Sequence, residues 1–419
     1  MERKRAIYIL RALCTNDGSA ISLLDSTSPA AWCDIIRQLQ MLELAPLFFS
    51  YLARTQAVAH VPAEVLHRLQ EAYFLHAARN TIILEDLGEI IRILDLHGID
   101  AIVLKGACLA GTVYDDIALR PMHDIDILIR EKDLRVVQAL LLGMGYGPRR
   151  RPAVADQLLQ HHHLIPFTRP GRPSVEVHAT LTPPGGPCAI AMDGFWDRAR
   201  SVAFGGLRAL TLSPEDLLLH LCLHFSANHR FSILEMKNLL DISETIKRHH
   251  TEIKWRTLGE RARGYGIGRY VYCTLRLSAA LFGAQLRPED LQSIGQEDDD
   301  IRIADMLADV LLDETAFPLP DALEQMDRED GLASKALVLV RSVVPPLSYL
   351  ARKYGIADTQ GPALHSLYLR HWMEGAVRVG KFLAHLLCGS RRARATVTRR
   401  RATVSINNWL RSGSSPRPS

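Results

Sequence analysis

The chain has 419 residues, of which 47% are hydrophobic, 6% are aromatic and 23% are charged. Because a single hydrophobic core stops growing at roughly 250 to 300 residues, this length predicts two or three domains. The hydrophobic content excludes a largely disordered chain, and the abundance of Leu and Ala favours a soluble protein rich in helix.

The net charge of +4 hides an uneven distribution, because residues 375–419 hold ten Lys or Arg and no Asp or Glu. The residues before them are therefore net negative, which argues against nucleic acid as a partner of the main body. The basic tail is a candidate to contact an anionic surface of phosphate or lipid. Residues 376–388 have two interpretations: a helix lying on an anionic membrane, or a packing helix followed by a solvated basic tail.

Seven cysteines are scattered without a Cys-x-x-Cys pair, so the sequence suggests neither a zinc knuckle nor a disulfide framework. This usage favours a reducing, cytoplasmic location. The basic N-terminus is interrupted by Arg11, Asn16 and Asp17, unlike a secretory signal. The longest apolar runs fall far short of the ~20 residues that a membrane-spanning helix needs, so we expect no transmembrane segment.

Helical periodicity dominates residues 1–97, where apolar residues recur at intervals of three and four, and Gly98 is a candidate C-cap. Residues 99–147 then predict strand, helix, strand and helix. The expected elements are a buried strand at 101–104, a helix from Lys105 to Tyr114, a strand at 123–129 and a helix at 131–142.

Residues 164–168 and 174–178 flank the turn sequence Arg-Pro-Gly-Arg-Pro, which predicts a β-hairpin. From Ser213 onward the pattern is helical again, since Ser213 is a suitable N-cap and Pro214 fits the first helical position. Helical periodicity continues with interruptions to about residue 315, and further apolar helical pieces lie within 335–388.

These elements predict an α+β fold that is mostly helical, with a small mixed β-sheet core between N- and C-terminal helical regions. The expected organisation is a helical region at 1–98, an α/β core at 99–210, a helical region at 211–388 and a basic, disordered tail at 389–419.

Asp124 and Asp126 are the residues that indicate a function most strongly. Side chains at i and i+2 of a strand lie on one face, so the two carboxylates converge while Ile125 and Ile127 face the core. Adjacent like charges are costly unless a cation lies between them, and Mg²⁺ or Mn²⁺ takes oxygen ligands from carboxylates and phosphates. The pair therefore predicts a divalent metal that holds a nucleoside triphosphate.

Nucleotidyl transfer with two metal ions usually needs a third carboxylate, and Glu176 is the candidate. It lies in the middle of a predicted strand between two valines, on the opposite face, which it shares with His178. If this strand lies beside that of the two aspartates, the three acids meet. The alternative is an exposed hairpin carboxylate paired with Arg169 or Arg172.

Lys105 and Gly106 follow a buried strand and precede a helix, where free backbone N–H groups and the helix dipole favour an anion. We expect the phosphates of the nucleotide to bind there. Arg120, four residues before Asp124, is a candidate cation for the triphosphate or for charge that develops at the transferred phosphorus.

The segment LKGACLAGTVYDDIALRPMHDIDILI (104–129) resembles the signature of the uncharacterised nucleotidyltransferase family of the polymerase-beta-like superfamily. Leu-Lys-Gly, a Tyr, Arg-Pro and Asp-x-Asp follow one another in the family's order. SVEVHATL carries the later Glu-x-His pair, and the resemblance continues through LSPEDLLLHLCLH and NLLDISETI, over roughly residues 30–285. It implies a metal-dependent nucleotidyltransferase fold flanked by helices.

The sequence thus predicts an enzyme that transfers a nucleoside monophosphate from a nucleoside triphosphate to an unknown small-molecule, sugar or peptide acceptor and releases pyrophosphate. Asp124, Asp126 and Glu176 are the expected catalytic metal ligands. One departure supports an alternative: Gly106-Ala107 stands where the wider superfamily has Gly-Ser or Gly-Gly. The alternative is a non-catalytic accessory protein of a biosynthetic pathway that keeps the fold.

Several further residues have a functional and a structural interpretation. His220 and His224 share a helix face at i, i+4, which suits zinc, but no Glu follows His220 as in a His-Glu-x-x-His protease, so core or structural histidines are favoured. The histidines at 161–163 are interpreted as a solvated strand entrance. Asp241 is either a substrate-facing residue or half of a surface ion pair, and Cys108 is interpreted as a packing residue.

Overall fold

The computed structural model describes residues 2–148, 163–182, 190–204, 207–295 and 298–313, and scattered positions between 336 and 406 that include the continuous run 368–375. Two compact units divide the chain, Met1–Leu312 and Asp313–Ser419. The helices and strands named below all lie in the first unit. The predicted tail at 389–419 and the candidate amphipathic helix at 376–388 lie almost entirely outside the described residues.

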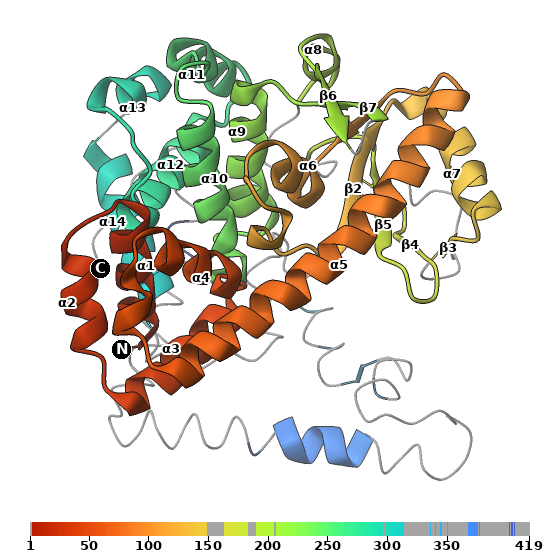
Figure 1. Ribbon diagram of the computed structural model, residues 1–419. Helices are drawn as coiled ribbons and strands as arrows, with labels where there is room; N and C mark the ends of the chain where they lie inside the picture. Colours follow the sequence, from red (N-terminus) through yellow and green to blue (C-terminus); the bar gives the residue numbers. More distant parts are fainter. Residues whose placement is uncertain are drawn as a thin grey trace. The chain divides into compact units, whose positions relative to one another are not determined.

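Five helices precede the sheet, as the spacing of apolar residues predicts (Figure 1). α3 shows why they begin where they do. The Ser28 hydroxyl accepts a 3.3 Å hydrogen bond from the Ala31 amide, and Pro29 occupies the first helical position. One face of α3, with Trp32 and Leu39, is buried. The five are α1 (Glu2–Cys14), α2 (Ser19–Asp25), α3 (Pro29–Met41), α4 (Ala45–Arg54) and α5 (Ala63–Leu96).

Seven strands form one sheet in the order β3-β4-β5-β2-β1-β7-β6. The central strand β2 is antiparallel to β1 and parallel to β5, and β1 is parallel to β7, so the sheet is mixed. The predicted mostly helical α+β fold with a small mixed sheet is therefore confirmed. The strands are β1 (Ala101–Val103), β2 (Asp124–Ile129), β3 (Gly147–Pro148), β4 (Phe167–Thr168), β5 (Ser174–His178), β6 (Arg200–Phe204) and β7 (Leu207–Thr211).

The order strand, helix, strand and helix predicted for 99–147 is confirmed by β1, α6 (Lys105–Thr112), β2 and α7 (Leu134–Gly143). The predicted hairpin is confirmed too, because β4 and β5 pair antiparallel with Phe167 opposite Val175. β6 and β7 were not among the predicted strands, although a Gly-Gly pair between two alternating runs is a usual hairpin signal. Together they extend the sheet beyond β1.

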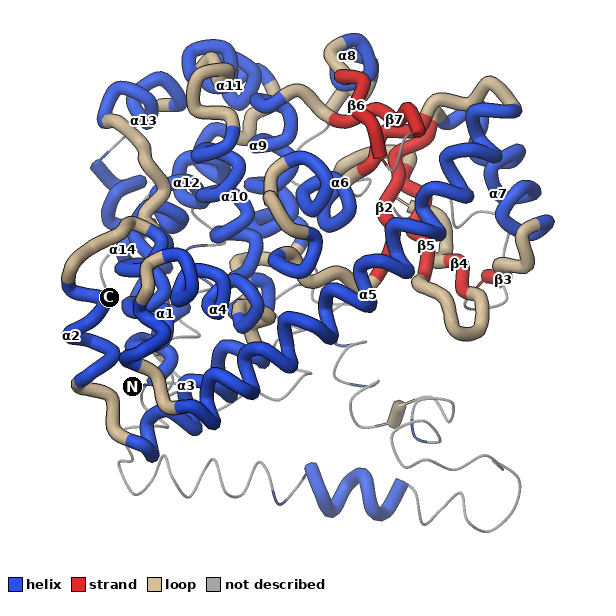
Figure 2. Tube along the Cα trace, in the orientation of Figure 1, coloured by secondary structure: helices blue, strands red, loops and turns tan. Residues whose placement is uncertain are grey.

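The 34-residue helix α5 runs from the N-terminal helices to the sheet, as one long diagonal element in Figures 1 and 2. It packs against α4 and also against β2 and β7. Asn80 donates a 2.8 Å hydrogen bond to the carbonyl group of Arg120. Asp86 accepts hydrogen bonds of 2.9 and 2.8 Å from Tyr146 and Arg172. Because a buried polar group without a partner costs about 1–3 kcal/mol, Asn80 fixes α5 against the segment before β2, and Asp86 fixes it against the start of β3 and the β4–β5 hairpin.

After the sheet the chain is helical again, beginning at the predicted N-cap. The Ser213 hydroxyl accepts a 3.3 Å hydrogen bond from the Asp216 amide, and Pro214 opens α9. Among the described residues, every helix is too short or too polar to cross a membrane. The remaining helices are α8 (Asp193–Asp197), α9 (Pro214–Leu223), α10 (Lys237–Arg248), α11 (Trp255–Gly264), α12 (Gly268–Phe282), α13 (Pro288–Ile294) and α14 (Asp298–Leu312).

The packing of α11 against α13 depends on Gly259, because a β-carbon there would lie 2.0 Å from the carbonyl oxygen of Ser293. Gly259→Ala is expected to lower the free energy of unfolding by about 2–3 kcal/mol, since the two backbones must move apart. Urea unfolding measures the loss. Gly264→Ala in the same helix is the matched control, because open space surrounds that position. Equal effects of the two substitutions would contradict this packing.

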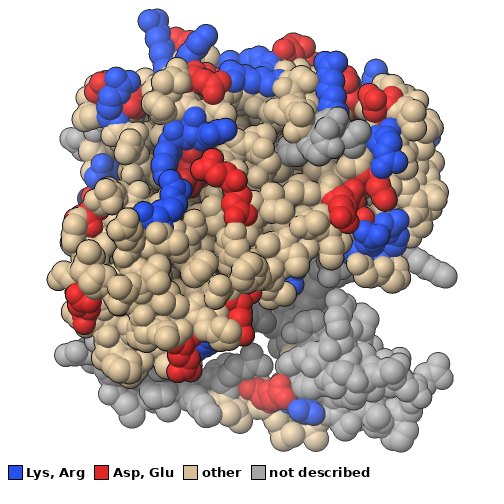
Figure 3. All heavy atoms as spheres, in the orientation of Figure 1, with Lys and Arg blue, Asp and Glu red and all other residues tan. Residues whose placement is uncertain are grey.

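Charged side chains on the face drawn in Figure 3 are mixed, since Lys and Arg lie beside Asp and Glu. The lower part of this face carries fewer charges. Proteins that bind nucleic acid usually gather their basic residues into a patch or stripe, and the described residues on this face form none.

Candidate functional site

Asp126 and Glu176 lie side by side at the centre of the sheet. β2 and β5 are parallel, with Asp126 paired with Glu176 and Asp124 paired with Ser174. Alternate residues of a strand face opposite sides, so the acidic residues share one face of the sheet. The apolar residues between them, such as Ile125 and Val175, are buried on the other face. The condition under which the three acids meet, that these two strands are neighbours, is fulfilled.

The hairpin arginines have a different acidic partner from the one considered in the sequence analysis. Arg172 Nη1 lies 2.8 Å from Asp86 Oδ1, and Arg169 Nη2 lies 3.4 Å from the same oxygen. Glu176 Oε2 lies 3.7 Å from His178 Nε2, and the Glu176 side chain is 24% exposed. Glu176 therefore belongs with the residues on its own face of the sheet.

Asp126 is held by two nitrogen donors. Lys105 Nζ and His178 Nε2 each lie 2.7 Å from its Oδ1, and the Asp126 side chain is only 4% exposed. Burial opposes ionisation, but the Lys105 ammonium and the hydrogen bond from His178 outweigh it and hold the pKa of Asp126 well below its usual range. Burial also works against the charge of Lys105, yet Asp126 raises the pKa of Lys105 overall. The two groups therefore form a charged, buried ion pair.

His178 is neutral in this arrangement. Burial lowers its pKa to about 4, although the hydrogen bond to Asp126 acts in the opposite direction. A neutral imidazole facing a carboxylate carries its proton on the nearer nitrogen, so Nε2–H donates to Asp126 and Nδ1 is left as an acceptor. From the sequence, His178 was expected on the same strand face as Glu176, but no role in the site was predicted for it. Its i+2 spacing from Glu176 was the signal that could have indicated a contact with the acidic residues.

The side chains of three residues come close enough to share one ion. One ligand atom each of Asp126, Glu176 and His178 lies within 4.8 Å of the other two. Burial and the charges of Asp126 and Glu176 raise the pKa of the nearby Asp124 to about 6. Crowded carboxylates of this kind are relieved by a divalent cation, which prefers oxygen ligands. The carboxylate oxygens of Asp124, Asp126 and Glu176 therefore fit a divalent metal ion, while His178 orients Asp126.

Lys105 reaches Asp126 from the start of α6 with an unusual backbone conformation. Its φ of 44° lies in the left-handed region, which costs a non-glycine residue about 1–2 kcal/mol. The Leu104 amide donates a 3.0 Å hydrogen bond to the Asp126 carbonyl group, which continues the β1–β2 pairing to the site. At Gly106 a β-carbon would lie 3.0 Å from Met122 Cγ, so glycine permits the close approach of α6 to the segment before β2.

Arg120 forms a separate, buried ion pair. Its Nε lies 2.8 and 2.9 Å from the two carboxylate oxygens of Asp241, and the two side chains are 7% and 1% exposed. The Tyr114 hydroxyl donates a 2.8 Å hydrogen bond to the same carboxylate. Arg120 therefore ties the segment before β2 to α10, and the ion pair considered for Asp241 is buried rather than on the surface.

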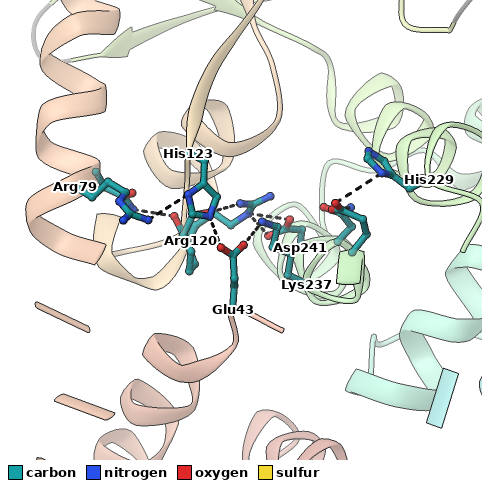
Figure 4. Close-up of polar contacts among 11 residues, drawn as sticks. Glu43, Arg79, Arg120, His123, His229, Lys237 and Asp241 are labelled. Atoms are coloured by element: carbon teal, nitrogen blue, oxygen red, sulfur yellow. Dashed lines mark hydrogen bonds and ion pairs between the residues drawn. The ribbon is translucent and has the colours of Figure 1, made fainter. Parts of the chain in front are cut away.

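A second polar network joins four segments of the chain beside Asp124. Glu43, between α3 and α4, contacts His123 with one carboxylate oxygen and Lys237 of α10 with the other (Figure 4). Arg79 of α5 lies 3.2 Å from Nδ1 of His123. The charge of Lys237 also partly opposes the rise in the pKa of Asp124. This network was not predicted from the sequence, because its members lie far apart along the chain.

The Glu43 network predicts a pH dependence of stability. Burial opposes its ionisation, but the hydrogen bond from His123 and the charge of Lys237 prevail and lower the pKa of Glu43 to about 2. A carboxylate with a lowered pKa stabilises the folded state above its unfolded pKa, and this contribution is lost as the pH falls from about 4.5 towards 2. Glu43→Gln should therefore lower the free energy of unfolding at pH 7 by about 1–3 kcal/mol.

At pH 3 the free energies of unfolding of Glu43→Gln and of the unchanged protein should differ by less than at pH 7. Chemical unfolding at the two pH values measures this difference. Glu64→Gln is the control, because Glu64 is an exposed residue of the first turn of α5. A difference of equal size at both pH values would contradict this account of Glu43.

His163 and Cys108 are two other residues singled out from the sequence. His163 pairs with His178 across the sheet, with ring centroids 5.3 Å apart, whereas residues 161 and 162 lie outside the described residues. Cys108 is fully buried, its sulfur lies 2.8 Å from Thr211 Oγ1, and burial raises the pKa of its thiol. The interpretation of Cys108 as a packing residue is confirmed.

Comparisons with individual known proteins add no support to the resemblance found in the sequence, whereas a family model does. No curated protein matches the chain in sequence. One similar solved structure is the crystal structure of an antigenic nucleotidyltransferase-like protein from Paracoccidioides brasiliensis. It is 15% identical, the alignment covers 51% of this chain and 95% of that chain, and the TM-score of 0.29 is too low to support an argument.

A family model described as "Uncharacterised nucleotidyltransferase" matches residues 28–283, from α3 to the end of α12. The match includes the whole sheet, both aspartates of β2 and the glutamate of β5. Because it spans more than half of the sequence, the chain belongs to this family of uncharacterised nucleotidyltransferases.

Proposed function

We propose that the protein is a metal-dependent nucleotidyltransferase that moves a nucleoside monophosphate from a nucleoside triphosphate to an acceptor and releases pyrophosphate. The observation that carries the proposal is the parallel pairing of Asp126 with Glu176 beside Asp124. Burial and the neighbouring charges of Asp126 and Glu176 on the same face raise the pKa of Asp124 to about 6. Crowded carboxylates destabilise a folded protein, and they occur mainly at sites where a cation or substrate relieves their repulsion.

In this proposal Asp124, Asp126 and Glu176 hold Mg²⁺ or Mn²⁺, ions that prefer carboxylate oxygens. The metal, when bound, would neutralise the triphosphate and stabilise the charge that develops on the transferred phosphorus. His178 keeps Asp126 oriented through its 2.7 Å hydrogen bond. All three acids lie on the neighbouring strands β2 and β5, so little backbone adjustment is needed to form the site.

The triphosphate would bind at the N-terminus of α6. Lys105 is proposed to exchange its 2.7 Å contact with Asp126 for a contact with phosphate when the metal and nucleotide enter. Gly106 leaves the backbone there close to the segment before β2. The guanidinium of Arg120 donates to Asp241 and to the carbonyl group of Pro121, so we assign Arg120 the role of positioning the β2 aspartates instead of binding phosphate.

The acceptor is proposed to be a small molecule, a sugar or a peptide. A cavity of about 710 Å³ opens beside Glu43, with a lining that includes Gln40, Arg68, Glu71 and Leu75. Its volume lies within the range of small-molecule sites, roughly 300–1,000 Å³. Glu43 lines this cavity and contacts His123, the residue before Asp124, so the Glu43 network connects the cavity to the carboxylate site.

Two observations favour a non-catalytic accessory protein as the second candidate. Ala107 provides no hydroxyl group for the triphosphate. In addition, Lys105 already neutralises Asp126, which lowers the need for a metal at that carboxylate. In this second candidate the fold and the ion pair are retained, and the protein contributes a binding surface to a biosynthetic pathway.

The test is a screen of the four ribonucleoside triphosphates, labelled at the α-phosphate, with cell extract and Mg²⁺ or Mn²⁺. Our proposal predicts that the label is transferred to an acceptor while unlabelled pyrophosphate is released. Asp124→Asn protein is the control, because it removes a proposed metal ligand. Identical labelling with the control protein would contradict the proposal.

A further inference from the structure

A second cluster of metal-ligating side chains lies where α9 ends and α10 begins. One ring nitrogen of His224, one of His229 and one carboxylate oxygen of Glu235 all lie within 4.8 Å of one another. The two imidazole rings meet edge to face with centroids 4.4 Å apart. Nδ1 of His229 lies 3.7 Å from Oε1 of Glu235, the contact drawn to His229 in Figure 4. These residues are distinct from those of the carboxylate site.

The backbone between these three residues makes them converge. α9 continues into a π-helical turn, His224–Asn228, and such turns are frequent at functional sites. Arg230 and Phe231 then have left-handed φ angles of 50° and 56°, which are costly for residues other than glycine. The wide turn and the reversal bring Glu235 back beside the two histidines.

The chemistry of the donors selects the kind of ion. Two imidazoles and one carboxylate form a known zinc-binding set, which leaves a fourth position for water or a substrate atom. Ligands at roughly 2.0–2.1 Å from a tetrahedral ion lie about 3.3–3.4 Å apart. The 3.7 Å between His229 and Glu235 is close to that separation. We propose that His224, His229 and Glu235 bind a divalent transition-metal ion of the Zn²⁺ class.

The surroundings of the cluster suit an ion that enters from solvent. The side chains of His229 and Glu235 are 37% and 25% exposed. On the inner side, Nδ1 of His224 is buried and has no hydrogen-bond partner within the described part of the chain. Asn238 donates a 3.2 Å hydrogen bond to Oε2 of Glu235, so Oε1 is the oxygen that faces His229. Hydrogen bonds of this kind orient the ligands of metal sites.

The bound ion would fix the start of α10 against the end of α9. Glu235 lies two residues before Lys237, whose charge acts on Asp124, and α10 also carries Asp241, the partner of Arg120. The ion therefore has a positioning role for α10.

Titration of the full-length Asp126→Asn protein with Co²⁺, a spectroscopic substitute for Zn²⁺, tests the site. This background disables the carboxylate site, so one equivalent of Co²⁺ should bind with the visible absorption of a four- or five-coordinate nitrogen and oxygen site. Adding His229→Gln or Glu235→Gln should weaken binding by on the order of 100-fold or more, since even residues that only orient ligands are worth 10–100-fold. His250→Gln, an exposed histidine just after α10, is the matched control.

Circular dichroism establishes that each variant is folded. Unchanged Co²⁺ affinity in both His229→Gln and Glu235→Gln would overturn the proposal. X-ray absorption of the Zn²⁺-loaded Asp126→Asn protein provides a measurement without further variants: scattering from two imidazoles supports the site, and its absence overturns it. Neither result depends on nucleotidyl transfer, so this proposal and the proposed function can fail separately.

Discussion

Asp126→Asn is expected to lower the rate of nucleotidyl transfer by at least about 10³-fold. The substitution removes the charge that both the Lys105 ion pair and the proposed metal require, while it keeps the shape of the side chain. The rate is measured as transfer of the α-phosphate label from a nucleoside triphosphate to the acceptor. Asp115→Asn is the matched control, because Asp115 is 76% exposed and should leave the rate unchanged.

A loss of fold would imitate a loss of catalysis, so the thermal unfolding of Asp126→Asn is measured alongside its activity. The carboxamide can still accept the hydrogen bond from His178, and we expect a folded protein. If the folded variant transfers label at the rate of the unchanged protein, Asp126 is not a ligand of an essential metal.

Asp241→Asn is expected to lower the free energy of unfolding by about 3–5 kcal/mol, because it leaves the buried Arg120 guanidinium without a counter-charge. The two side chains are 7% and 1% exposed, so water cannot replace the lost carboxylate. Urea unfolding measures the effect. The control is Glu260→Gln, which removes one partner of an exposed pair with Arg256 and should cost less than about 1 kcal/mol.

The double variant Arg120→Met with Asp241→Leu separates the cost of leaving the Arg120 charge unpaired from the loss of the ion pair itself. Replacing both charged partners removes the uncompensated charge, so this variant should be more stable than Asp241→Asn alone. A loss below about 1 kcal/mol in Asp241→Asn would show that the pair is hydrated and would contradict its assignment as the link between β2 and α10.

Much of the sheet and the acidic face could be predicted because the relevant signals are local. The i, i+2 spacing of Asp124 and Asp126 sets their face in any strand, and the Pro/Gly turn after β4 sets the hairpin. The parallel pairing of β2 with β5 is not a local property. It was inferred only as a condition for three acids to meet, and the sheet register meets that condition.

Contacts between distant segments could not be predicted in the same way. Glu43 and Lys237 lie 194 positions apart, and neither has a local pattern that distinguishes it from a surface charge. Arg120 and Asp241 were each singled out, but their mutual ion pair depends on how α10 packs against the sheet.

The histidines after α9 illustrate a different limit. The i, i+4 pair His220 and His224 drew attention in the sequence, and their ring centroids lie 6.1 Å apart. The closer partner of His224 is His229, because the π-helical turn changes the register of side chains after residue 223. A period of 3.6 residues cannot reveal such a change.

Calorimetric titration with nucleoside triphosphates tests the central claim most directly. We predict that at least one of the four ribonucleoside triphosphates binds saturably in the presence of Mg²⁺ or Mn²⁺, and that binding disappears without metal and in folded Asp126→Asn protein. If none of the four binds with either metal, or if binding is unaffected by both the metal and the substitution, Asp124, Asp126 and Glu176 do not form a nucleotide-binding metal site.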